Sequence, residues 1–146
     1  MLYIHCMVNL SEFNLNFAEF FLRIFLGILF IFQGYDKLFV LKIKHVVLTF
    51  QEDATRKGIP MYLITFVSYY TSVVEFFGGI ALVLGFFHEL AYLLLAFNLL
   101  IVAVAFSVMK PVWDLHHVFP RVILLTLIII LSKHFLFGLD TLFSLN

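Results

Sequence analysis

The sequence predicts an all-α membrane protein, a single bundle of four transmembrane helices with almost no soluble domain. Of its 146 residues, 64% are hydrophobic and only 12% are charged, and the mean hydropathy is +1.10. Soluble domains hold about 45–50% apolar and about 25% charged residues, so this composition lies outside their range. Four long apolar segments follow one another without the alternation that is typical of strands.

The first half of the chain supplies a tail and two of the expected helices. We expect residues 1–16 to form an N-terminal tail and residues 17–140 to form the transmembrane domain. A spanning helix needs about 20 residues to cross a ~30 Å hydrocarbon core. The apolar segment 17–39 has that length, and so does segment 61–86, which begins after Pro60, where a helix tolerates proline.

The second half supplies two further helices and follows the one long connection. We expect a helix over residues 90–109, ended by Pro111, and another over residues 117–137, with Pro120 in its first turn. The long connection, residues 42–58, is partly amphipathic and has basic ends. A short helix lying at the membrane interface is therefore expected there.

The distribution of Lys and Arg predicts the orientation of the chain. The first and third connections lie on one side of the membrane and carry most of these residues, namely Lys37, Lys42, Lys44, Arg56, Lys57, Lys110 and Arg121. The other side has only Arg23 and Lys133, both within expected helices. Because basic residues favour the cytoplasmic side, we expect a multi-pass protein with both termini outside and the long connection in the cytoplasm.

Charge and cysteine content exclude several classes of protein. The net charge is zero, so no nucleic-acid partner is indicated. The single cysteine, Cys6, rules out an internal disulfide, a CxxC redox pair and a cysteine metal cage. A redox role would therefore need a quinone, another cofactor or a second subunit. Residues 1–16 contain no Lys or Arg, so no cleaved signal peptide is expected, and either Met1 or Met7 is the start.

Three polar side chains are expected inside the membrane: Arg23, Glu75 and Asn98. A rise of ~1.5 Å per residue places them ~9, ~16 and ~12 Å from the side that carries the termini, and therefore in one layer. A charged group in lipid requires a partner or a function. Two interpretations stay open. One is a structural ion pair of Arg23 with Glu75 or with Glu19; the other is a cluster that binds a polar head group or relays protons.

Small residues accompany these charged side chains at helical spacing. Gly27 and Gly34 share a face with the arginine of the first helix, and Gly78 and Gly79 share a face with the glutamate of the second. Small residues let membrane helices approach closely, so we expect the two faces to meet inside the bundle.

A second polar group is expected at the opposite membrane surface. It consists of Gln33, Asp36, Lys37, Trp113, Asp114, His116, His117 and Arg121. These residues form either an interfacial belt in which Asp114 caps the fourth helix, or a mouth that binds an anionic or quinone head group through Arg121 and a histidine. His88 and His134 could in principle be axial haem ligands. Neither lies deep in a helix, so neither haem nor a metal is expected.

Three motifs together resemble the DoxX family of small bacterial membrane proteins. Residues 23–39, RIFLGILFIFQGYDKLF, are similar to the arginine, glycine, glycine-x-x-lysine pattern of the family's first helix. Residues 75–79, EFFGG, with Gly85 after them, are similar to the family's glutamate before paired glycines. Residues 113–121, WDLHHVFPR, resemble the form seen in a subgroup. The matching positions are Arg23, Gly27, Gly34, Lys37, Glu75, Gly78, Gly79 and Arg121.

The resemblance implies a connection to membrane redox chemistry. The family is named for a subunit of an archaeal thiosulfate:quinone oxidoreductase, and other members are linked to oxidative-stress or sulfur-redox partners. A related group uses cysteine chemistry that this chain lacks, so a thiol-exchange role is not expected.

We therefore expect a membrane subunit of a redox system, without a redox centre of its own, that binds a quinone or a similar lipid-soluble molecule. Glu75 and Arg23 would hold or protonate its head group, with Asn98 as a hydrogen-bond partner. Lys37 and Arg121 would serve at the other mouth or contact a partner protein. Two alternatives stay open: a structural anchor or assembly subunit whose buried ion pair only fixes helix packing, and a small transporter, which would need a homodimer.

Overall fold

The computed structural model describes residues 2–109 and 118–132, with side chains over residues 12–108 and 118–132. Every regular element in this part of the chain is helical. Three helices are long and apolar enough to span a membrane, and a fourth apolar helix is shorter. The all-α membrane class is therefore confirmed, whereas the bundle of four spanning helices stays a prediction.

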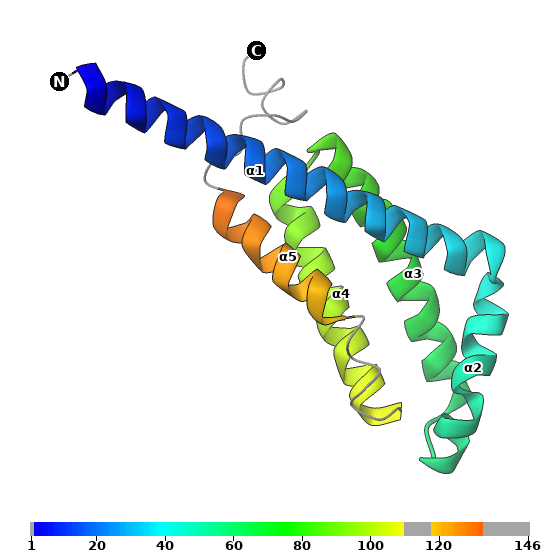
Figure 1. Ribbon diagram of the computed structural model, residues 1–146. Coiled ribbons are helices and arrows are strands. Elements are labelled where there is room, and N and C mark those ends of the chain that lie inside the picture. Colours follow the sequence, from blue (N-terminus) through cyan, green and yellow to red (C-terminus); the bar gives the residue numbers. More distant parts are fainter. Residues whose placement is uncertain (1, 110–117, 133–146) are drawn as a thin grey trace.

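Helix α1 covers Leu2–Tyr35 and continues into a π-helical turn, η1, at Asp36–Val40. It begins well before the predicted first helix, which starts at Phe17. Residues 2–16 contain neither glycine nor proline, so nothing in the expected tail interrupts the helix. Figure 1 shows the first turns of α1 extending beyond the other helices.

Helix α2, Lys42–Arg56, forms within the long connection, where the amphipathic pattern predicts a short helix. The chain turns into it at Lys42, which has a φ of 60°. Val47 and Ala54 are buried against Ile64 of the next helix, α3 (Met61–Leu84), whereas most other side chains of α2 are exposed or half-buried. In Figure 1, α2 lies beside the first turns of α3.

Helices α3 and α4 (His88–Met109) form an antiparallel hairpin. Pro60 precedes α3 with an extended backbone, and Gly85 ends it with left-handed angles, φ 62° and ψ 40°, which glycine adopts without strain. The bounds of both helices lie close to the predicted ranges 61–86 and 90–109.

Helix α5, Phe119–Leu131, has Pro120 in its first turn and packs against α1 and α4. The end of the predicted fourth helix, residues 133–137, lies outside the described part of the chain. The core shared by α1, α3, α4 and α5 consists of Leu26, Phe30, Leu82, Ala91, Tyr92, Leu95, Leu99, Val118, Leu125 and Ile128.

Large apolar side chains also cover the outer surface. Phe32, Phe66 and Leu93, from three different helices, are 64%, 68% and 68% exposed on the isolated chain. An outer surface of this kind is unfavourable in water and suits contact with lipid. Together with the three long apolar helices, it identifies a multi-pass membrane protein.

The close contact between α1 and α3 depends on glycine. A Cβ atom at Gly34 would lie 2.5 Å from the backbone nitrogen of Phe76, and one at Gly79 would lie 2.8 Å from the carbonyl oxygen of Gly27. Both distances are too short for non-bonded atoms, so a side chain at either position would force the two helices apart. The structure thus places these three glycines in one helix contact.

Candidate functional site

Glu75 and Lys37 form a buried ion pair between α3 and η1. Only 1% of the Glu75 side chain is exposed, whereas the Lys37 side chain is 26% exposed. The ammonium nitrogen of Lys37 donates to Oε2 of Glu75 over 2.6 Å. Sequence reasoning places Glu75 in a layer inside the membrane and Lys37 in the polar group at the opposite surface, and the structure brings them together.

Arg121, near the start of α5, adds a second cation to the surroundings of Glu75. Its half-buried guanidinium is attracted by the Glu75 carboxylate. No hydrogen bond or ion pair joins this guanidinium to any residue in the described part of the chain. The Glu75 carboxylate thus pairs with Lys37 over 2.6 Å and also attracts Arg121 without a direct bond.

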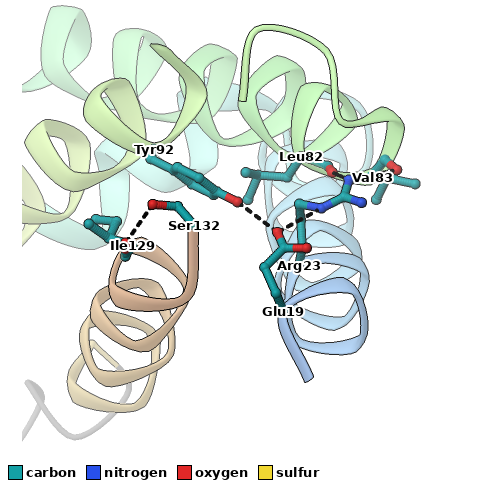
Figure 2. Close-up of polar contacts among 7 residues, drawn as sticks. All are labelled: Glu19, Arg23, Leu82, Val83, Tyr92, Ile129 and Ser132. Carbon is teal, nitrogen blue, oxygen red and sulfur yellow. Dashed lines mark hydrogen bonds and ion pairs between the residues drawn. The ribbon is translucent and has the colours of Figure 1, made fainter. Parts of the chain in front are cut away.

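Arg23 belongs to a different cluster, at the other end of α3 (Figure 2). Its Nε donates to Oε1 of Glu19, one turn away on α1, over 3.1 Å, and its Nη1 donates to the carbonyl oxygen of Leu82 over 2.6 Å. The hydroxyl of Tyr92, on α4, donates to the same Glu19 oxygen over 3.1 Å. These contacts join α1, α3 and α4. Of the two ion pairs considered for Arg23, the structure contains the one with Glu19.

The prediction that Arg23 and Glu75 lie in one layer of the membrane is wrong. α1 and α3 run antiparallel, and the contact of Gly34 with Phe76 places Glu75 level with the end of α1. Arg23 lies about twelve residues earlier on α1, or ~18 Å away along the helix axis. The expected depths were measured from the predicted start of the first helix, but α1 begins at Leu2 and extends past the end of α3.

Asn98, on α4, does lie at the level of Glu75. Gly78, predicted to face the first helix, faces α4, where an added Cβ atom would lie 3.0 Å from Leu95. One turn further along this antiparallel pair, Glu75 and Asn98 come level. Asn98 is 0% exposed, and neither its Nδ2 nor its Oδ1 has a hydrogen-bond partner among the described residues.

An apolar groove of about 620 Å³ lies between α2, α3 and α4. Lys37 lines it together with the polar side chains of Ser68 and Thr71, and the remaining walls are mostly aliphatic and aromatic. Because Lys37 is also bonded to Glu75, the groove is connected to the buried carboxylate. Away from this polar end, Lys57 donates to the carbonyl oxygen of Val108 and so links the end of α2 to α4.

Sequence reasoning missed the groove and Tyr92. The groove forms where a short amphipathic helix stands against two apolar ones, so no local pattern indicates it. Tyr92 gave a weak signal, since a phenol inside an apolar segment usually needs a hydrogen-bond partner. It also follows His88 by one helical turn, and the two rings pack with their centroids 5.9 Å apart.

Several residues of the second predicted polar group lie outside the described residues. These are Trp113, Asp114, His116 and His117, and the same holds for His134. Within the described ranges, no group of three or more His, Cys, Asp or Glu side chains could hold a metal ion.

Comparison with known proteins identifies one family. The model of the family described as DoxX matches residues 18–108, from the middle of α1 to the end of α4. The matched range contains Arg23, Lys37, Glu75 and Asn98, and it ends before Arg121. No curated protein and no solved structure matches the chain.

Proposed function

This multi-pass membrane protein belongs to the DoxX family, and on that premise we propose that it binds a quinone or a similar lipid-soluble carrier for a membrane redox system. The observation that carries the proposal is the apolar groove between α2, α3 and α4, with Lys37 among its lining residues. A quinone has an apolar tail and a polar ring, and ligand sites typically combine apolar walls with a few placed polar groups.

The groove suits both parts of such a molecule. Its aliphatic and aromatic walls would hold the tail, and the ammonium of Lys37 would donate a hydrogen bond to a ring oxygen. Glu75, bonded to Lys37, would accept or supply the proton that the ring exchanges. The proposed head-group site therefore contains Glu75 with Lys37, and Arg23 supports the helix packing elsewhere.

The chain has a single cysteine and therefore no cysteine pair, and in this proposal the electrons come from a partner protein. When bound, the quinone would supply the redox chemistry, and this chain would bind it, orient it and manage its protons. A homo-oligomer is compatible with this arrangement, because the groove lies within one chain.

The proposed orientation places α2 in the cytoplasm and both termini outside the bacterial inner membrane. Lys42, Lys44 and Arg56 lie on α2, and basic residues favour the cytoplasmic side. A Lys44→Cys variant made in a Cys6→Ser background should react with a membrane-impermeant thiol reagent in inverted vesicles only. Reaction in right-side-out vesicles would reverse the orientation.

The proposal is tested by the quinone content of protein purified gently in native lipid. We expect near-stoichiometric quinone in the unaltered protein and loss of it in Lys37→Met and Glu75→Gln. Lys44→Met removes an exposed lysine that does not line the groove, and it should retain the quinone. A quinone content no higher than that of the surrounding lipid would contradict the proposal.

A structural anchor is the second candidate, and the Glu19–Arg23–Tyr92 cluster favours it. This cluster joins three helices and contacts no groove residue by a described hydrogen bond. If the Lys37–Glu75 pair also served packing alone, the double variant Lys37→Met with Glu75→Leu would restore both stability and function. Under the quinone proposal, the double variant restores stability alone.

A further inference from the structure

Asn98 is a buried amide with unmet hydrogen-bonding capacity. It is 0% exposed, and both its donor nitrogen and its acceptor oxygen lack partners among the described residues. Its neighbours one turn before it and one residue after it, Leu95 and Leu99, belong to the apolar core. A buried amide without partners is unfavourable, so a residue of this kind indicates a group that completes its hydrogen bonds.

A second amide, at nearly the same level of the bundle, also has a buried atom without a hydrogen-bond partner among the described residues. The Oε1 atom of Gln33, on α1, is buried and has no partner among the described residues. Gln33 precedes Gly34, which contacts Phe76 next to Glu75. Polar groups with unmet capacity therefore come from two helices, α1 and α4, at the level of one buried carboxylate on α3.

The groove does not account for these groups. Neither Asn98 nor Gln33 is among the residues that line it, so a molecule in the groove would not contact them. The missing partner must be small, because it fits between packed helices, and it must both donate and accept, because Asn98 offers an acceptor and a donor. Water meets both requirements, and buried water typically binds two to four polar groups.

We propose that Asn98 binds an internal water molecule that also hydrogen-bonds to the carboxylate of Glu75. The water accepts a hydrogen bond from Nδ2 of Asn98 and donates one to the carboxylate of Glu75. Resting on the proposed function, this water is the relay through which Glu75 regains a proton after transferring one to a bound head group. As the water passes one proton to a Glu75 oxygen, it takes up another from the ammonium of Lys37, so the water is neutral before and after the transfer. Lys37, whose side chain is 26% exposed, then regains its proton from water at the membrane face.

Toward the Glu19 cluster, the described residues offer no such route. Leu26, Phe30, Leu82 and Leu95 are each 0% exposed and lie between the Glu75 level and the Glu19 cluster. A packed layer of these side chains contains no group that can carry a proton. The water therefore connects Glu75 only with the membrane face on which η1 and α2 lie.

The test is hydroxyl-radical footprinting, in which radicals formed from bound water oxidise side chains next to it. It is done on protein stripped of quinone, so that a failure of quinone binding and a failure of this inference are separate results. We expect Leu95 to be oxidised although it is buried, and Leu26, equally buried but remote from Asn98, to stay unmodified. Asn98→Leu should abolish the oxidation of Leu95.

Two further measurements test the proposal if Asn98→Leu folds poorly: footprinting of Asn98→Ser and the melting temperature of Asn98→Leu. Asn98→Ser keeps a hydroxyl and leaves room for water, so oxidation of Leu95 should persist in it. Asn98→Leu should lower the melting temperature, because it removes a satisfied polar group. An unmodified Leu95 in the unaltered protein, or a raised melting temperature in Asn98→Leu, would overturn the proposal, since both indicate an amide with no bound water.

Discussion

Lys37 reaches Glu75 because of a local feature of the backbone. It lies in the π-helical turn η1, which continues α1 for one wide turn, and such turns frequently occur at functional sites. In this position its ammonium nitrogen lies 2.6 Å from Oε2 of Glu75. The pairing matters because either charge alone, in surroundings that solvate ions poorly, would be strongly unfavourable.

Breaking this ion pair should be more damaging than removing it. We expect Lys37→Met and Glu75→Leu each to lower the free energy of unfolding by ~3–5 kcal/mol, because each removes one partner of the ion pair and leaves the other without its nearest opposite charge. The double variant should recover most of that loss. Chemical denaturation in mild detergent measures the free energy of unfolding of all three variants. A loss in the double variant equal to the sum of the two single losses would show that the two residues are not coupled.

The Tyr92 hydroxyl should contribute to stability through Glu19. Tyr92→Phe removes the 3.1 Å hydrogen bond to a buried carboxylate, so we expect a loss of ~1.5–3 kcal/mol. Tyr69→Phe is the matched control, because Tyr69 is 59% exposed. Thermal unfolding of both variants in the same detergent measures the difference. Equal effects would mean that Tyr92 contributes no more than a surface phenol.

Sequence reasoning identified the important residues better than their partners. Arg23, Glu75 and Asn98 stand out because polar groups inside apolar segments are few. Their pairing depends on the register between antiparallel helices and on the reach of long side chains. The sequence leaves two partners open for Arg23, Glu75 and Glu19, because no residue marks the start of α1 and the register of α1 against α3 is therefore undetermined. In the structure Arg23 pairs with Glu19.

At the scale of whole elements, α1 and α3 are held close by the absence of side chains. Gly34→Ala would place a Cβ atom 2.5 Å from the backbone of Phe76, which cannot move without the helix. We expect a loss of ~1–3 kcal/mol from overpacking. Gly78→Ala is the matched control, since it meets only the flexible side chain of Leu95 at 3.0 Å. Chemical denaturation measures the free energy of unfolding of both variants. Equal losses would contradict a helix contact that depends on Gly34.

The elements that could be predicted are those with marked ends. Pro60 and Gly85 delimit α3, and the backbone preferences of these two residue types predict the ends of the helix from the sequence alone. The start of α1 has no such mark. The π-helical turn η1, Asp36–Val40, has no such mark either, since it contains neither glycine nor proline.

At the scale of the whole molecule, two polar clusters lie at different levels of one apolar bundle. Glu19, Arg23 and Tyr92 occupy the end near the hairpin between α3 and α4, and Figure 2 shows them between those helices and α1. Glu75 and Lys37 lie further along the bundle, beside the groove that α2 closes. Lys37 of the second cluster lines the groove, and Glu19, Arg23 and Tyr92 do not, which is why the proposed function is placed there.

The most direct test of this account fills the groove and leaves its charges in place. Val67→Trp inserts an indole into the groove wall, and Tyr69→Trp is its control on the exposed face of the same helix. The measurement is quinone per chain in protein purified in native lipid, with stability compared in parallel. We predict that the Val67 variant loses its quinone while the Tyr69 variant keeps it. An equal quinone content in both folded variants would contradict a quinone site in the groove.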